Sequence, residues 1–325
     1  MSKMVNTVLG PVPANEIGKT LMHEHFFFGY PGFTGNTLHE KSFAELLDLG
    51  VEVANRVKAQ GVKTVVDATP SDCGRNPELL KAVSEKSGVN IICSTGYYYE
   101  GEGAPAYFKF KQALGSAEEE LYELFMDEIT NGIGDTGIKP GVIKLASGKG
   151  AISDYEKLFF KVGAKVQQET GIPIITHTQE GTMGPEQAEL LISEGVDPKK
   201  IVIGHMDGNT DIQYQLKTLK QGVYAGFDRI GIQEFVGAPL DSERLAVLVG
   251  LISSGYADQL TLSHDTVNVW LGGPTVFPDE LSSLLKDWEI DHIFKNIIPR
   301  LMENGVSEES INTILEGNPK NIFNA

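Results

Sequence analysis

Short apolar runs rich in β-branched residues alternate along this chain with longer segments in which apolar residues recur at helical spacing. Eight runs have the length of strands, and the segments between them often end at a glycine, which is typical of helix ends. The predicted strands are Thr20–His25, Lys63–Ala68, Asn90–Thr95, Gly141–Leu145, Pro173–His177, Ile201–His205, Val223–Asp228 and Gln259–Asp265. The clearest predicted helices are Phe43–Gln60, Glu118–Asn131, Asp154–Thr170, Pro185–Glu194 and Asp241–Ser254.

Eight strands that alternate with helices in a chain of this length predict a (β/α)8 TIM barrel, an α/β fold. No linker, low-complexity segment or block of charge divides the chain, so we predict that residues 1–325 form a single domain. In such barrels the chemistry lies at the C-terminal ends of the strands. Polar residues at those ends are therefore the first candidates for a functional site.

The charge balance restricts the ligands that the protein can bind. The chain has 27 basic and 44 acidic residues and a net charge of −17, which repels nucleic acids and anionic membranes. We expect a small neutral or apolar substrate and no nucleic-acid or membrane partner. Neither a signal peptide nor a membrane-spanning run is evident, so a cytoplasmic protein is expected. The only cysteines, Cys73 and Cys93, are expected to be buried free thiols.

Histidines gather at the predicted strand ends. His23 and His25 alternate with Glu24, so both should point to the same face of their strand. His177, His205 and an aspartate, Asp265, each end another predicted strand. Imidazole and carboxylate are the usual protein ligands of zinc, iron and cobalt, so this set predicts a transition-metal site.

The remaining histidines have less distinctive positions. His264 precedes Asp265 and should face away from the site by the same alternation, in a structural role. His39 and His292 lie away from the predicted strand ends, and we expect both at the surface.

Lys144 lies within an apolar predicted strand, where an ammonium group would suffer a large desolvation penalty. It could reach solvent or pair with an acid. It could instead be a Schiff-base lysine, as in an aldolase, because burial depresses the pKa of the amine. In a third interpretation carbon dioxide carboxylates the amine, and the resulting carbamate bridges two metal ions.

The third interpretation accounts for all the candidate ligands. His23, His25 and Asp265 would then bind one ion, with His177 and His205 on the other. Two ions about 3.5–4 Å apart can hold a bridging hydroxide and polarise the bond under attack. Asp265 would take the proton of that hydroxide as the reaction proceeds. The chemistry implied is hydrolysis of an ester-like centre.

The sequence around these residues resembles a known family. The segments that carry the resemblance, in chain order, are Leu21–His25, Gly141–Lys144, Thr176–Thr178, Ile203–His205, Gly226–Arg229, Leu262–Asp265 and Asn318–Phe323. Together they resemble the phosphotriesterase family of the amidohydrolase superfamily, and in particular its phosphotriesterase-like lactonase branch. The resemblance implies a binuclear metal hydrolase. Its more buried ion would be bound by His23, His25 and Asp265, its exposed ion by His177 and His205, and carboxylated Lys144 would bridge them.

The resemblance also suggests residues that bind substrate. Tyr98 matches a lactonase-type tyrosine that can hydrogen-bond a carbonyl, and Arg229 resembles an arginine that shapes the pocket. Tyr97, Trp270 and Trp288 complete the predicted substrate pocket, because an aromatic lining suits an apolar acyl chain. A homodimer is implied as well.

We therefore expect a metal-dependent hydrolase that opens lactones, acyl-homoserine lactones or other γ/δ-lactones, by attack of a metal-bridging hydroxide. Asp265, Lys144, Tyr98 and Arg229 would be its catalytic residues, and organophosphate triesters side substrates. Acyl-homoserine lactones would make it a quorum-quenching enzyme. The expected ions are Zn²⁺, with Co²⁺, Mn²⁺ or Fe²⁺ as alternatives. Three other functions remain open: a dedicated phosphotriesterase or aryl esterase on the same site, a metal-free Schiff-base aldolase, and a metal-binding protein without catalysis.

Overall fold

Parallel strand pairing follows the order of the chain. The computed structural model describes residues 2–38, 40–235, 237–273 and 275–325. Within these ranges a nine-stranded parallel sheet runs in the order β10-β9-β8-β7-β6-β5-β4-β3-β11. Its strands are β3 (Thr20–Phe28), β4 (Thr64–Asp67), β5 (Asn90–Gly96), β6 (Val142–Ser147), β7 (Ile174–Thr178), β8 (Ile201–Ile203), β9 (Tyr224–Phe227), β10 (Leu260–Leu262) and β11 (Val267–Trp270).

The sheet closes into a barrel because β10 and β11, which stand at the two ends of the strand order, are consecutive segments of the chain. β10 pairs with β9 and β11 pairs with β3. Between them, the backbone N–H of Asp265 donates to the carbonyl of His23 at 3.2 Å, and that of His25 donates to the carbonyl of Thr266 at 3.0 Å. These bonds join the last strand segment to the first barrel strand. The predicted (β/α)8 barrel is confirmed.

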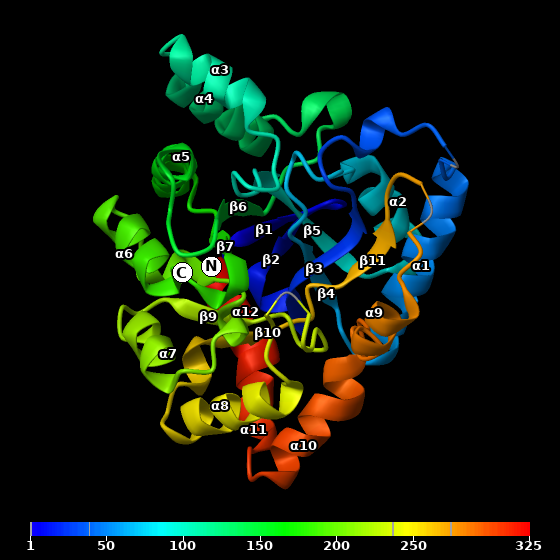
Figure 1. The fold of residues 1–325 in the computed structure, drawn as a ribbon, viewed down its shortest axis with the longest axis vertical. Coiled ribbons are helices and arrows are strands. Elements are labelled where there is room, and N and C mark those ends of the chain that lie inside the picture. Colours follow the sequence, from blue (N-terminus) through cyan, green and yellow to red (C-terminus); the bar gives the residue numbers. More distant parts are fainter. Residues whose placement is uncertain (1, 39, 236, 274) are drawn as a thin grey trace.

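Helices surround the strands, as Figure 1 shows. Two long helices, α1 and α5, begin with capping boxes, Ser42 with Glu45 and Ser153 with Glu156, which satisfy the free N–H groups of the first turn. The helices are α1 (Phe43–Ala59), α2 (Pro77–Ser87), α3 (Ala106–Ala113), α4 (Ala117–Thr130), α5 (Asp154–Thr170), α6 (Gly184–Ser193), α7 (Ile212–Leu219), α8 (Asp241–Ser253), α9 (Asp279–Leu284), α10 (Ile298–Glu303), α11 (Glu308–Asn312) and α12 (Asn318–Asn324). None of the helices in the described ranges has the length and apolar character needed to cross a membrane.

Apolar side chains fill both the space under the helices and the interior of the barrel. The interior cluster combines strand residues with the hairpin β1 (Met4–Thr7) and β2 (Gly10–Pro13), which the sequence pattern did not predict, and with α12. The members of this cluster include Val5, Met22, Val66, Ile92, Val142, Ile175, Val202, Tyr224, Ile322 and Phe323. Polar residues of the barrel thus gather above an apolar plug. Cys73 and Cys93 are buried free thiols, as predicted.

Candidate metal centre

Two of the candidate ligands follow strands that end earlier than predicted. β8 ends at Ile203 and β10 at Leu262, whereas the sequence pattern extended these strands to His205 and Asp265. Both residues instead adopt left-handed backbone conformations, with φ of 58° at His205 and 54° at Asp265. Such conformations cost free energy in residues other than glycine and occur preferentially at functional sites. Here they turn two candidate metal ligands into the top of the barrel.

The first barrel strand carries two more histidines. The pairing of β3 with β4 shifts register between Leu21 and Glu24, and such irregularities redirect side chains. His23 and His25 both lie within reach of the Asp265 carboxylate. Glu24 faces away from them, and its carboxylate accepts a 2.7 Å hydrogen bond from Nδ1 of His264. Alternation along β3 therefore places the two candidate ligands on one side of the strand and Glu24, with its partner His264, on the other.

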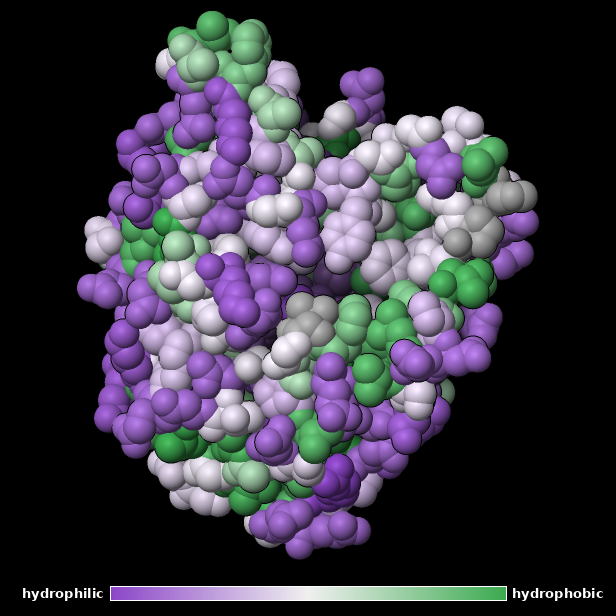
Figure 2. All heavy atoms as spheres, in the orientation of Figure 1, coloured by the Kyte–Doolittle hydropathy of each residue, from purple (hydrophilic) through white to green (hydrophobic). Residues whose placement is uncertain are grey.

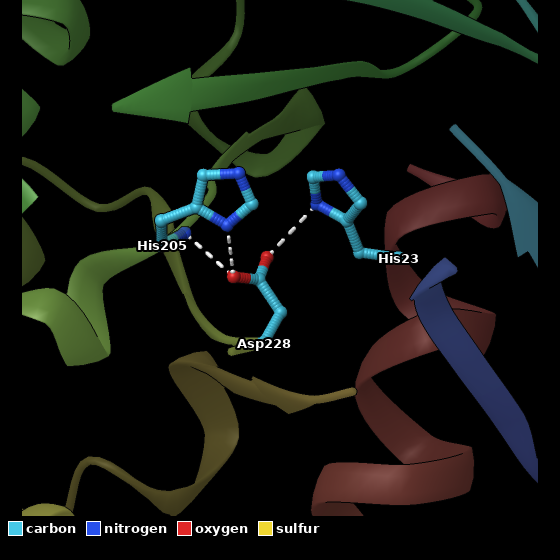
Figure 3. A group of neighbouring side chains, drawn as sticks. All are labelled: His23, His205 and Asp228. Atoms are coloured by element: carbon cyan, nitrogen blue, oxygen red, sulfur yellow. Dashed lines mark hydrogen bonds and ion pairs between the residues drawn. The ribbon is translucent and has the colours of Figure 1, made fainter. Parts of the chain in front are cut away.

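Asp228 orients two of these histidines from below (Figure 3). Its carboxylate accepts hydrogen bonds from Nδ1 of His23 at 3.0 Å and from Nδ1 of His205 at 2.7 Å. The three residues could together hold an ion, but both Nδ1 atoms are already engaged with the carboxylate. An Nδ1–H donor leaves the lone pair on Nε2, so Asp228 fixes the tautomer that a metal ligand needs.

The other two histidines have partners of a different kind. Nδ1 of His25 lies 2.8 Å from Oγ1 of Thr69, and Nε2 of His177 donates to Oε1 of Gln179 at 2.8 Å. Each of the four histidines thus has one ring nitrogen held by a supporting residue. The second nitrogen of each points into a shared space, which is the arrangement of metal-binding histidines in proteins.

The free nitrogens converge on Asp265 and on one another. Nε2 of His25 lies 3.0 Å from Oδ1 of Asp265, and Nε2 of His23 lies 3.5 Å from the same oxygen. On the other side, Nε2 of His205 lies 3.7 Å from Oδ2 of Asp265 and 2.9 Å from Nδ1 of His177. His23, His25 and Asp265 therefore form one group that could hold an ion, and His177 and His205 supply the beginnings of a second.

The pair of His177 and His205 fits a bound cation. Because Gln179 and Asp228 accept from the opposite ring nitrogens, the two facing nitrogens both carry lone pairs, only 2.9 Å apart. Such lone pairs repel one another unless a proton or a metal ion lies between them. Burial, together with the positive charge of Arg229, lowers the pKa of both histidines well below the ordinary value, which disfavours the proton.

Lys144 lies among these ligands in full burial. Its Nζ is 2.7 Å from Nε2 of His23, and among the described residues no carboxylate oxygen lies within 4.0 Å of it. Burial lowers its pKa to about 8 despite the nearby charges of Asp265 and Asp228. The amine is therefore neither exposed to solvent nor paired directly with an acid.

Arg229 and Asp265 form an ion pair at the floor of the cavity. Nε of Arg229 donates to Oδ2 of Asp265 at 3.0 Å. Burial alone would raise the pKa of Asp265, but the charge of His205, a hydrogen bond from His25 and the charge of Arg229 hold it well below the ordinary value. Asp265 is accordingly an ionised carboxylate at neutral pH, as a metal ligand must be.

A cavity of about 630 Å³ opens above these residues. Figure 2 shows the opening as a hollow near the middle of the face that is turned to the viewer, with apolar residues along part of its rim. Tyr98, Trp270 and Trp288 line it, as do Lys144, Arg229 and Asp265. The Tyr98 ring lies 4.9 Å from that of His177, and its hydroxyl makes no hydrogen bond to any described residue. The cavity therefore combines an apolar wall with a polar floor.

Tyr97 does not belong to this cavity, and its assignment to the substrate pocket is corrected. Its ring packs against Phe108, Phe125 and Phe159 in the layer between the barrel and the helices. Both tyrosines lie beyond the end of β5 at Gly96, and of the two only Tyr98 lines the cavity among the described residues.

His292 is a second correction. It is buried rather than exposed, and its Nε2 lies 2.9 Å from Oδ2 of Asp241. His39 lies outside the described residues. Sequence reasoning gave no role to Asp228, Thr69 or Gln179, the partners that orient the histidines. A signal was present for Asp228, because it ends a predicted strand exactly as the ligands do.

Comparison with known proteins agrees with this geometry. The family model described as "Phosphotriesterase family" matches residues 3–323. The aryldialkylphosphatase of Saccharolobus solfataricus is 35% identical over 314 residues, which cover 96% of each chain. The organophosphorus hydrolase from Deinococcus radiodurans is 54% identical, with a TM-score of 0.97 over 99% of this chain and 97% of that one. A structure described as organophosphate hydrolysis activity engineered from a weak promiscuous lactonase template is 51% identical, with a TM-score of 0.97 over 99% and 100% of the two chains.

Proposed function

This chain belongs to the phosphotriesterase family and is a hydrolase, and on that premise we propose that it opens lactones at a two-metal centre, with slower hydrolysis of organophosphate triesters. One observation carries the proposal. Four histidines present free nitrogens beside Asp265 and Lys144, directly under a cavity with an aromatic wall. The aldolase alternative does not explain why four histidines and Asp265 lie together, since Schiff-base chemistry needs only the lysine.

The residues that would hold the ions follow from the free ligand atoms. His23, His25 and Asp265 would bind one ion and His177 and His205 the other, with Lys144 carboxylated by carbon dioxide as the bridge. Zn²⁺ is the first candidate and Co²⁺, Mn²⁺ or Fe²⁺ the alternatives, since all accept these ligands. Two divalent ions, when bound, polarise the bond under attack and supply a nucleophile from water at neutral pH.

The surrounding side chains would manage protons and developing charge. The ionised carboxylate of Asp265 would take the proton of the attacking water and return it to the leaving alkoxide. Arg229, 3.0 Å from that carboxylate, would hold it in place. The free hydroxyl of Tyr98 would donate to the carbonyl oxygen as negative charge develops there.

The cavity wall supports an apolar acyl group as the rest of the substrate. Trp270 lies within 6.2 Å, ring to ring, of Phe28, Tyr30 and Phe277, which together form a continuous aromatic surface. A flat aromatic wall buries an alkyl chain without needing a polar partner. A chain with net charge −17 also favours a neutral lactone over an anionic substrate. Acyl-homoserine lactones, and with them a quorum-quenching role, fall within this class.

A dedicated phosphotriesterase is the second candidate. It is favoured by the relatives named aryldialkylphosphatase and organophosphorus hydrolase, which are 35% and 54% identical to this chain. The same floor of the cavity suits both reactions, because a tetrahedral phosphorus centre resembles the tetrahedral intermediate of lactone opening.

The test compares kcat/KM for three substrates on protein reconstituted with zinc or cobalt and bicarbonate: a long-chain acyl-homoserine lactone, a plain δ-lactone and an aryl dialkyl phosphate. We expect lactone values at least about a hundredfold above the triester, which corresponds to about 2.7 kcal/mol of transition-state binding. The reverse ranking would assign the triester as the main substrate. Activity that survives a chelator, with borohydride trapping of a carbonyl substrate, would instead support the aldolase.

A variant of the wall separates the acyl-chain argument from the metal centre. Trp270→Ala should raise KM for the long-chain lactone and leave that for the δ-lactone nearly unchanged, because only the long chain reaches the aromatic surface. Equal effects on both lactones would show that Trp270 supports the site in general rather than binding the acyl chain.

A further inference from the structure

Gln179 lies between a metal-binding histidine and the cavity. It is the first residue beyond β7, and its Oε1 accepts a hydrogen bond from Nε2 of His177 at 2.8 Å. The half-buried side chain also lines the cavity, and its Nε2 makes no hydrogen bond to any described residue. One end of this amide is therefore committed to His177, and the other offers N–H donors to the cavity.

The backbone around Gln179 is held firmly. Its carbonyl accepts from both the N–H and the hydroxyl of Thr182, at 3.2 and 2.8 Å. The next two residues, Glu180 and Gly181, have left-handed conformations, with φ of 51° and 63°. A Cβ on Gly181 would lie only 2.5 Å from the carbonyl carbon of Gly208, so this loop is packed tightly against the loop that follows His205. A side chain on such a loop is positioned before substrate arrives.

Gln179 differs in this respect from the other partners of the metal histidines. Asp228 and Thr69 hold their histidines from within the barrel, and neither lines the cavity in the described part of the chain. A carboxylate or a hydroxyl would suffice as the acceptor for His177. The amide of Gln179 accepts from the histidine and, unlike a carboxylate, also carries N–H donors for a second partner.

We propose that Gln179 acts twice in the reaction: it orients His177 toward the metal, and it donates an amide hydrogen to a substrate oxygen, the carbonyl oxygen of a lactone or the phosphoryl oxygen of a triester. The second role rests on the proposed function, and the first does not. A fixed donor beside the ligand of the exposed ion stabilises negative charge where it develops on that oxygen.

Two substitutions separate the roles, and a third serves as control. Gln179→Ala removes both the acceptor and the donor. Gln179→Glu keeps an acceptor for His177 and lacks the N–H. Gln112→Glu makes the same chemical change on the exposed surface of α3, away from the cavity. Each protein is loaded with zinc and bicarbonate and then dialysed against a graded chelator. Metal content is measured by atomic emission, and kcat and KM on the δ-lactone at saturating zinc.

We expect Gln179→Ala to hold its second zinc about 10- to 100-fold more weakly, the usual effect of losing such a partner. Gln179→Glu should retain two ions at wild-type affinity while kcat falls at least about tenfold, and Gln112→Glu should match the wild type in both. Wild-type zinc affinity in Gln179→Ala would overturn the orienting role. Wild-type kcat in Gln179→Glu would overturn the donor role. If the wild type opens no lactone, the proposed function fails, and the zinc affinities still decide the orienting role.

Discussion

Replacing Asp228 with asparagine should weaken metal binding without unfolding the barrel. The Asp228 carboxylate accepts from Nδ1 of His23, from Nδ1 of His205 and from the backbone N–H of His205, at 3.0, 2.7 and 2.6 Å. An asparagine has one acceptor oxygen in place of two, so its NH₂ group must face a histidine donor. That histidine then turns or changes tautomer, and in either case its Nε2 lone pair is lost to the metal.

The size of the effect follows from these contacts. Losing a hydrogen bond to a charged acceptor costs about 1.5–3 kcal/mol, which is roughly 10- to 150-fold in a binding constant. This range agrees with the 10- to 100-fold loss of metal affinity typical of such partners. Because the remaining oxygen still accepts from one of the two histidines, Asp228→Asn should weaken mainly one of the two proposed ions, the one bound by the histidine that faces the NH₂ group.

The assay is competition for zinc against a chelator of known affinity, followed by metal analysis and by thermal unfolding of the metal-free protein. Asp241→Asn is the matched control, since Asp241 is also a buried carboxylate, bonded to Arg244 and His292, and touches none of the metal histidines. The control should lose stability and keep both ions. Two ions bound at wild-type affinity in Asp228→Asn would refute the reasoning that Asp228 sets the histidine tautomers.

Three further predictions concern the lysine, the buried charges and the assembly. Because burial lowers the pKa of Lys144 to about 8, its reactive neutral form grows about tenfold per pH unit below that value and levels off above it. At constant dissolved carbon dioxide, recovery of activity by metal-free protein should follow this curve, whereas a rate still rising steeply above pH 9 would contradict it. Arg244→Met removes the cation that pairs with the buried carboxylates of Asp207 and Asp241, so urea unfolding should show a loss of about 3–5 kcal/mol, against less than about 1 kcal/mol for Lys217→Met at an exposed pair with Glu186. The homodimer stays a prediction, and light scattering should give twice the chain mass of 35.3 kDa, with a single-chain mass contradicting it.

The barrel could be predicted because its signal is repeated. Each strand is a short apolar run, and each run is separated from the next by a segment of helical spacing, so an error at one end does not disturb the pattern. The ends themselves could not be predicted. His205 and Asp265 extend apolar runs and look like strand residues, yet both turn into left-handed conformations. That turn is imposed by contacts with other strands, such as the bond from Asp265 N–H to the His23 carbonyl, which no local pattern contains.

Side-chain direction after a strand is equally hidden from the sequence. Tyr97 and Tyr98 are chemically identical neighbours, and both are predicted from the sequence to line the pocket. The structure sends one toward Phe108 and the other toward the cavity. Both residues lie beyond the end of β5 at Gly96, where the alternation of a strand no longer fixes side-chain direction. Tyr98 and Tyr99, for example, both contact the ring of His177.

One residue that orients the histidines, Asp228, could be located from the sequence, but its role could not. Asp228 ends the predicted strand Val223–Asp228 just as His205 ends Ile201–His205, so the rule that located the ligands also reaches Asp228. Position at a strand end, however, does not distinguish a residue that binds the metal from one that orients a metal ligand. What separates them is the ring nitrogen that each carboxylate meets: Asp228 meets Nδ1 of His23, and Asp265 faces Nε2 of the same ring. That distinction is a property of the assembled barrel, because His23 lies on β3 while Asp228 and Asp265 follow β9 and β10, and these segments meet only after the barrel has closed.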